Sequence, residues 1–173
     1  MHHLLIVIAL FLTQAHNLAN ASSNERIIIG WIETVRIMPE KFDLVAKIDT
    51  GADNSSLDVA EWHSFMRDDT EWLRFSVKSN NDEIQTFERP LVRYAYIKRK
   101  RTEPVKRPVV TMQLCIGNTA FLAPVNLAKR HGFTYRMLIG RSFLQGSFLV
   151  DSALTETVSP KCDSLISIDD KQQ

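Results

Sequence analysis

Val45-Ala46-Lys47-Ile48-Asp49-Thr50-Gly51-Ala52-Asp53 is the stretch that decides the fold, because an apolar strand runs directly into an aspartate followed by a turn. A carboxylate at the end of a strand is held by a rigid scaffold, which suits a catalytic group. The same triplet also fits an ordinary turn, in which Asp49 caps the turn beside flexible Gly51. The Asp-Thr-Gly triplet alone therefore leaves both interpretations open.

A second motif, Leu138-Ile139-Gly140-Arg141, stands far downstream and overlaps a predicted helical turn at Arg141 to Leu144. Together the two motifs resemble the signature of the retropepsin-like aspartic peptidases. In that family the aspartate loop continues with alanine, and the late apolar-apolar-Gly-Arg segment crosses behind the loop. The resemblance implies an all-β fold, a retropepsin-like closed β-barrel (the acid protease fold) with one or two short helices. It also implies that the loop is supported by Ala52, Leu138, Ile139, Gly140 and Arg141.

The chain resembles more closely a bacterial branch of this superfamily, often labelled ATP-dependent zinc proteases, over roughly Ile28 to Asp151. Members usually carry a basic residue after the alanine, whereas this chain has Asp53-Asn54, which puts its substrate preference in question. The segments that carry the resemblance are Gly30-Trp31-Ile32-Glu33, Lys47 to Ala52, Arg107-Pro108-Val109-Val110, Met137 to Arg141 and Phe148-Leu149-Val150-Asp151.

The branch label does not fit the residues. The sequence has no His-Glu-x-x-His motif and no Gly-x4-Gly-Lys-Ser/Thr phosphate loop, so we expect neither ATP nor another cofactor. Beyond the predicted signal peptide, residues 1–21, only His63 and His131 remain, and neither has a second histidine or a cysteine at ligand spacing. A zinc site of His63 with Asp58 or Glu61 is conceivable, but an exposed surface explains these residues more simply. We therefore predict no metal site.

The resemblance implies catalysis by Asp49, Thr50 and Gly51, and it implies a homodimer, because the mechanism needs two aspartates and one copy supplies one. At the two-fold axis of a symmetric pair, like-charge repulsion keeps one carboxyl protonated while the other is ionised. The ionised carboxylate can activate a water as general base while the protonated one polarises the scissile carbonyl. Thr50 would brace the loop across the interface, Gly51 would allow close backbone approach, and Asp53 is expected to be structural.

Length and composition place the chain among ordinary globular proteins with one domain. It has 173 residues, 45% of them hydrophobic and 24% charged, and a formal net charge of +1. A net charge this close to zero gives no reason to expect a nucleic-acid partner or a membrane-surface partner. Any preference for a partner must therefore be local.

The N-terminus predicts export. Leu4 to Leu12 is an apolar run too short to span a bilayer, and Ala19-Asn20-Ala21 offers a cleavage site after Ala21. We therefore expect a signal peptide over residues 1–21, a peptidase domain over 22–151, a polar and loosely ordered tail over 152–173, and a periplasmic or secreted protein. The lack of Lys and Arg before the apolar run leaves an uncleaved anchor as the alternative.

The rest of the chain reads mostly as strands. Apolar alternation and turn residues predict a hairpin of Ile27 to Ile37 with Phe42 to Ile48, and the pattern Asp58-x-x-Glu61 predicts a short helix from Asp58 to Met66. Further strands are predicted at Trp72 to Lys78, Ile84 to Phe87, Leu91 to Ile97, Val109 to Ile116, Ala120 to Leu127, Met137 to Ile139 and Ser147 to Val150.

Three questions stay open from the sequence. Cys115 and Cys162 can form one disulfide in an oxidising compartment, although unpaired thiols are the simpler expectation. Both Ser79 to Asp82 and Lys98 to Arg107 could form the flap that covers an active-site cleft. The second segment is basic, and it is either a solvated hairpin tip or a patch that recruits acidic substrates. The residues that would recruit the substrate are Lys98, Arg99, Lys100 and Arg101.

The leading functional prediction is an aspartic endopeptidase that acts as a homodimer on peptides or proteins, with acidic ones as the candidate substrates. One alternative is a non-catalytic module that keeps the same scaffold and binds extended peptides by strand addition. A zinc-dependent peptidase, as the branch label suggests, is the other alternative.

Overall fold

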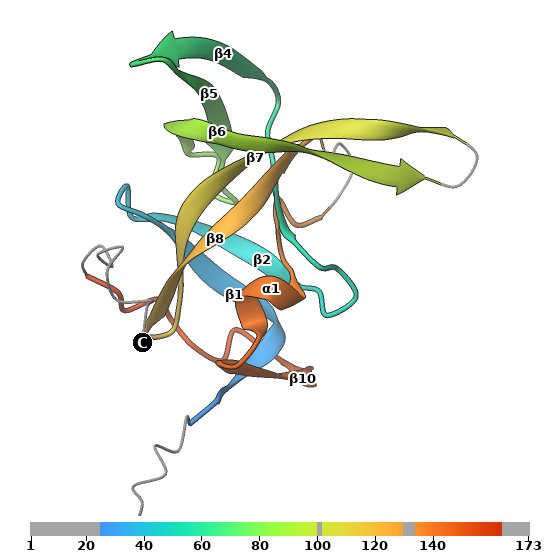
Figure 1. The fold of residues 1–173 in the computed structure, drawn as a ribbon. Coiled ribbons are helices and arrows are strands. Elements are labelled where there is room, and N and C mark those ends of the chain that lie inside the picture. Colours follow the sequence, from blue (N-terminus) through green and yellow to red (C-terminus); the bar gives the residue numbers. More distant parts are fainter. Residues whose placement is uncertain (1–24, 100–101, 130–133, 164–173) are drawn as a thin grey trace, which may run out of the picture.

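The computed structural model describes residues 25–99, 102–129 and 134–163, and their architecture is all-β with one short helix (Figure 1). The elements are β1 (Ile27–Met38), β2 (Phe42–Ile48), β3 (Ser55–Asp58), β4 (Trp62–Arg67), β5 (Thr70–Lys78), β6 (Ile84–Arg99), β7 (Thr102–Ile116), β8 (Thr119–Ala128), β9 (Met137–Ile139), α1 (Arg141–Leu144) and β10 (Phe148–Thr155).

The sheet closes on itself. Its strands lie in the order β10-β1-β2-β9-β3-β8-β7-β6-β5-β4, and an additional pairing of β1 with β7 closes β1, β2, β9, β3, β8 and β7 into a ring. The predicted closed β-barrel is therefore confirmed, as is the helical turn at Arg141–Leu144. Beyond the ring, β6, β5 and β4 extend as an outer sheet, and β10 lies on the opposite edge.

Alternating burial along the first hairpin explains why these residues form strands. In β2 the apolar side chains of Phe42, Leu44, Ala46 and Ile48 are buried, whereas the intervening residues are exposed or half-buried. β1 is buried on most of its length because it pairs with β2, β7 and β10. The buried apolar side chains form one core that continues from the ring to the outer sheet, where Phe75 on β5 stacks on Phe87 on β6 with ring centroids 5.7 Å apart.

Strand β6 changes its pairing partner along its length. Ile84 to Pro90 pair with β5, whereas Leu91 to Arg99 pair with β7, so Pro90 lies where the strand passes from one partner to the other. The sequence predicted two strands here, and the structure has one. Likewise Thr102 to Arg107 begin β7 instead of forming the predicted basic loop. The hairpin of β6 and β7 consequently projects from the barrel as an arm (Figure 1).

The predicted helix from Asp58 to Met66 is wrong. Asp58 ends β3, its carboxylate accepts a hydrogen bond from Arg136 at 2.8 Å, and its N–H donates to the Arg136 carbonyl at 2.7 Å. Residues Trp62–Arg67 form β4, paired in register with β5. The capping signal was local, and an ion pair with a distant residue together with β-forming aromatic side chains overrode it.

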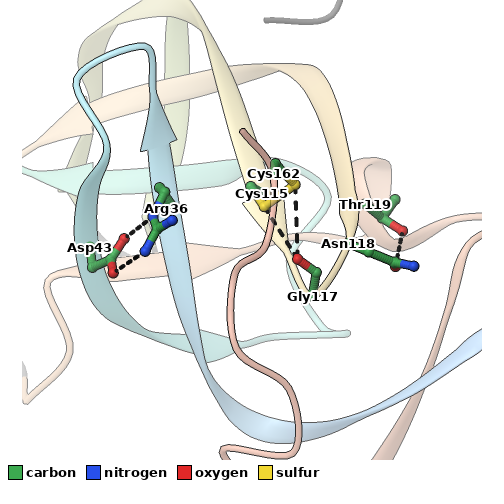
Figure 2. Close-up of a disulfide and its surroundings, with 7 residues drawn as sticks. All are labelled: Arg36, Asp43, Cys115, Gly117, Asn118, Thr119 and Cys162. Carbon is green, nitrogen blue, oxygen red and sulfur yellow. Dashed lines mark hydrogen bonds and ion pairs between the residues drawn. A yellow bond between two sulfur atoms is a disulfide. The ribbon is translucent and has the colours of Figure 1, made fainter. Parts of the chain in front are cut away.

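The segment after residue 151 was predicted to be loosely ordered, and for residues 152–163 that prediction is wrong. β10 continues to Thr155, Glu156 N donates to the Ile32 carbonyl at 2.7 Å, and Lys161 N donates to the Gly117 carbonyl at 2.7 Å. Cys162 forms a disulfide with Cys115, against the expectation of unpaired thiols. Figure 2 shows the two sulfurs beside the Gly117 carbonyl, in the turn between β7 and β8.

The predicted signal peptide lies outside the described residues, and so does the end of the predicted tail, residues 164–173. Within residues 25–99, 102–129 and 134–163, no helix is long and apolar enough to cross a membrane.

Candidate active site

Asp49 stands at the end of β2 with its backbone and carboxylate both held by hydrogen bonds. Its N–H donates to the Ile139 carbonyl at 2.8 Å, which continues the β2–β9 ladder by one residue. The Gly51 N–H donates to Asp49 Oδ1 at 3.0 Å, and the Ala52 N–H donates to the Asp49 carbonyl at 3.2 Å. Asp49 is half-buried, whereas Thr50 and Gly51 are exposed. The carboxylate is therefore fixed at a rigid position that stays open to solvent.

Arg141 holds the aspartate loop from behind. Its guanidinium donates to the Thr50 carbonyl at 2.8 Å and pairs with the Asp53 carboxylate. Its backbone N–H donates to the Ala52 carbonyl at 2.9 Å, and the Ser142 N–H donates to the Asp53 carbonyl at 3.0 Å. The start of α1 thus satisfies the carbonyls of the loop with both main-chain and side-chain donors.

Position 140 requires glycine because its backbone lies very close to the backbone of Asn54 in the aspartate loop. A Cβ at this position would lie 2.6 Å from the Asn54 carbonyl carbon and 2.8 Å from the carbonyl oxygen. The Gly140 N–H donates to Ser55 Oγ at 3.2 Å. A side chain here would push the Leu138 to Arg141 segment away from the aspartate loop, so the backbone packing explains the Ile-Gly-Arg sequence.

The structure brings together the two motifs that the sequence singled out. Asp49, Thr50, Gly51 and Ala52 form the loop, Ile139 and Leu138 lie in β9 between β2 and β3, and Gly140 and Arg141 lie against the loop. The proximity of these residues is established by the geometry. Their roles in catalysis stay predictions.

The basic residues of the arm are only partly within the described part of the chain. Lys98 and Arg99 lie at the end of β6, whereas Lys100 and Arg101 fall outside the described residues. Next to them on β7, the Lys106 ammonium lies 3.8 Å from the centroid of the Tyr94 ring. The arm therefore carries positive charge beyond the four residues that the sequence singled out.

The residues considered for a metal do not form a cluster. His63 Nε2 lies 3.6 Å from Glu61 Oε1, and both side chains are 72% exposed, while Asp58 pairs with Arg136. His131 falls outside the described residues. Across the described ranges there is no group of three or more His, Cys, Asp or Glu side chains that could hold a metal ion.

Two polar residues near the site were missed from the sequence. Ser55 links the motifs through its bond from Gly140, and Asn126 on β8 donates to the Ser55 carbonyl at 3.1 Å. The signal for Asn126 was present as a single amide inside the apolar run Ala120 to Leu127. Such a residue in a buried strand requires a polar partner.

Curated relatives match part of this chain. A probable alpha-L-glutamate ligase of Parasynechococcus marenigrum is 29% identical over 109 residues, which are 61% of this chain and 23% of the relative. A probable alpha-L-glutamate ligase of Shewanella pealeana is 28% identical over 121 residues, 68% of this chain and 26% of the relative. The chain thus spans about a quarter of the length of the curated relatives it matches.

A solved structure and a family profile match most of the chain. The crystal structure of Lpg0085 of Legionella pneumophila, a DUF785 protein of unknown function, is 30% identical with a TM-score of 0.68 and covers 77% of this chain and 98% of its own. The profile described as retropepsin-like aspartic endopeptidase RimB matches residues 28–161, which include both motifs. This chain therefore belongs to the RimB-like family of retropepsin-like aspartic endopeptidases.

Proposed function

We propose that this chain hydrolyses peptide bonds through an active site that a second copy completes, with Asp49 from each. The observation that carries the proposal is the fixed position of Asp49 at the end of β2. Its N–H donates to the Ile139 carbonyl, its carboxylate accepts from the Gly51 N–H, and Arg141 clamps the loop through the Thr50 carbonyl. A group that is fixed before substrate arrives needs little reorganisation during the reaction.

Paired Asp49 side chains would divide the chemistry between them. Two carboxylates that share a site cannot both be ionised at low cost, so one keeps a proton and the pair titrates as a unit. The ionised carboxylate takes a proton from water, the resulting nucleophile attacks the scissile carbonyl, and the protonated carboxyl donates a hydrogen bond to the carbonyl oxygen.

An apolar patch on the edge of the sheet supports pairing of two copies. Ile28 on β1 and Leu149 on β10 are register partners, and their side chains are 58% and 47% exposed. Trp31, three residues after Ile28, and Leu154, five residues after Leu149, are also exposed apolar residues on the same two strands. β10 ends the strand order, so its outer edge is open to a strand of a second copy.

The arm of β6 and β7 is the better candidate for the flap. The alternative, the turn of Ser79 to Asp82, is tied down: Ser79 Oγ accepts bonds from the Asn81 and Glu83 N–H groups, and Asn80 accepts one from Val45 on β2. In the arm, Thr102 to Pro108 of β7 pair with β6 and not with β8. A two-stranded ribbon of this kind can bend more readily than a turn bonded to the barrel.

The proposed substrate is an extended peptide, with acidic residues favoured by the basic arm. Lys98, Arg99, Lys100 and Arg101 would attract such a chain as it approaches. If so, replacing the four with serine slows cleavage of acidic peptides more than cleavage of neutral ones, and added salt reduces the difference. Equal rates on both peptides in the variant and in the wild type would end this part of the proposal.

The proposed compartment is the periplasm or the exterior. The predicted signal peptide points to export, and the Cys115–Cys162 disulfide supports it, because disulfides persist in oxidising compartments. Fractionation of cells that produce the full chain, with the N-terminal sequence of the recovered protein, tests both export and cleavage after Ala21.

The test of the proposed activity is cleavage of a complex peptide mixture by the protein without residues 1–21, across about pH 3 to 7, with Asp49→Asn as the control. Cutting that is favoured by acid and absent in Asp49→Asn supports the proposal. Sedimentation of the same preparation must show a dimer under the conditions of cutting. Activity from a strictly monomeric protein would contradict the shared site.

Capture of peptides without cleavage is the second candidate, and the open edge of β4 favours it. β4 ends the strand order on the side opposite β10, so its outer backbone groups can accept an added strand. A dimer that binds peptides and cuts none of them in the mixture would favour this alternative.

A further inference from the structure

Asn126 carries a buried hydrogen-bond acceptor that has no partner among the described residues. The side chain is 6% exposed, its Nδ2 donates to the Ser55 carbonyl at 3.1 Å, and its Oδ1 is buried and unpaired. An unpaired buried acceptor costs free energy, so an apolar side chain of similar size would avoid a cost that this one incurs.

The orientation of the amide follows from its neighbour. The Ser55 carbonyl oxygen can only accept, so the amide group must turn Nδ2 toward it. A flipped amide would place two oxygens together and leave the donor unpaired instead. The free atom of Asn126 is therefore the acceptor Oδ1.

A row of register partners places Asn126 on one face of the sheet. Lys47 pairs with Leu138, Leu138 with Ser56, Ser56 with Asn126, and Asn126 with Val109. Register partners on neighbouring strands project to the same face. The flanking Val125 and Leu127 belong to the apolar core, so the Asn126 row lies on the face that points away from the core.

Asp49 projects from the same face. It lies two residues after Lys47, and its N–H continues the ladder to β9, so the strand alternation holds up to Asp49. Val109, the register partner of Asn126, independently supports the placement of the Asn126 row outside the core, since it is 1% exposed and yet absent from the core cluster. The Asn126 Oδ1 acceptor and the Asp49 carboxylate thus lie on the same face of the sheet.

Asn126 also lies at the root of the arm. Its partner Val109 is the first residue of β7 to pair with β8, and the preceding residues of β7 pair with β6 alone. Bending of the arm would begin at this point. Residues 102–108 can therefore move without breaking pairs within the ring of strands, and a substrate group could reach the buried Asn126 Oδ1 only through a local movement of this kind.

We propose that Asn126 is a specificity-determining residue, whose Oδ1 accepts a hydrogen bond from a substrate side chain with a neutral donor, such as a carboxamide, a hydroxyl or a protonated carboxyl. The inference rests on the proposed peptidase function. Ser56, 5% exposed, is the next residue in the row on the same face, and the apolar Leu138 follows it. A site built to pair a polar group discriminates strongly against an analogue that lacks it.

The experiment compares peptides that differ at one position, with glutamine or methionine, chosen from a scan of every position around the cleaved bond. At one position the wild type should prefer glutamine by about tenfold in kcat/KM. Asn126→Leu, which removes the acceptor at similar volume, should bring this ratio close to one. Asn118→Leu, in the exposed turn after β7, is the matched control and should leave the ratio unchanged.

Each outcome decides the inference. Equal rates for the two side chains at every position in the wild type overturn it, whether or not Asn126→Leu folds. An unchanged ratio in folded Asn126→Leu, with both rates lowered alike, assigns Asn126 a structural role and also overturns it. If no Asp49-dependent cleavage occurs, the proposed function fails, and binding of the same peptides to Asp49→Asn still decides the preference of the subsite.

Discussion

Glu33 on β1 accepts hydrogen bonds from both the backbone N–H and the hydroxyl of Thr157, at 3.0 and 2.5 Å, although the two residues are 124 positions apart. Glu33 is fully buried, and it also accepts from the Gly30 N–H at 2.6 Å and the Val158 N–H at 3.3 Å. A buried carboxylate that is surrounded by donors fastens the segment after β10 to the first strand.

Glu33→Gln should lower the free energy of unfolding by about 1.5 to 3 kcal/mol, because it replaces a charged acceptor by a neutral group with one acceptor atom. Urea denaturation measures the change. Thr157→Val removes the hydroxyl and keeps the backbone bond, so its loss should be smaller, about 1 kcal/mol. An equal loss in the two variants would mean that the charge of Glu33 contributes little.

The disulfide should stabilise the chain through the 47-residue separation of Cys115 and Cys162. Closing a loop of that length removes about 4 kcal/mol of chain entropy from the unfolded state. Cys115→Ala with Cys162→Ala should lower the free energy of unfolding by up to that amount. Reductant should lower the free energy of unfolding of the wild type and leave that of the double variant unchanged. An unchanged free energy of unfolding in the reduced wild type would refute the prediction.

Gly140→Ala should reduce both stability and activity, because the added methyl would meet the Asn54 backbone. A loss of more than about 2 kcal/mol is expected, since backbone on both sides resists the displacement. Gly146→Ala is the control: it meets no atom within 4 Å but has φ +84°, so it should cost about 1 kcal/mol and keep the activity. Full activity in Gly140→Ala would contradict the role given to this contact.

Glu88 on the outer sheet makes a pH-dependent contribution to the stability of the protein. Hydrogen bonds from Arg67 and then Arg74, at 2.6 and 2.7 Å, hold the pKa of Glu88 below its ordinary value of 4.5. The folded-state pKa is lowered, so the stabilisation is complete above the unfolded value and disappears as the pH falls through the folded one.

Glu88→Gln should therefore destabilise the protein at neutral pH and make no difference in strong acid, where the wild-type carboxyl is protonated as well. Urea midpoints of both proteins across the acid range give the measurement. Glu83→Gln, at an exposed position in the turn before β6, serves as the control and should follow the wild type at every pH. A Glu88→Gln effect that persists unchanged into strong acid would argue against the ion pairs as its cause.

Much of the barrel and the pairing of the two motifs could be predicted from the sequence, because both depend on local signals. Alternating apolar residues mark the first hairpin, and glycines mark the loops where two segments approach closely. The failures have long-range causes. Asp58 was predicted to cap a helix because its actual partner, Arg136, is 78 residues away and leaves no local signal. The C-terminal segment was predicted to be loosely ordered because the residues that anchor it, Glu33 and Cys115, are also distant in the sequence.

The parallel pairing of the first and last strands also determines when the domain can be completed. Ile27 lies beside Phe148, so the outer edge of β1 has no partner until nearly the whole chain is available. Translation adds roughly 5–20 residues per second, so the nascent chain spends several seconds without its closing strand. During that time the outer edge of β1 stays unpaired, and the domain cannot reach its final form.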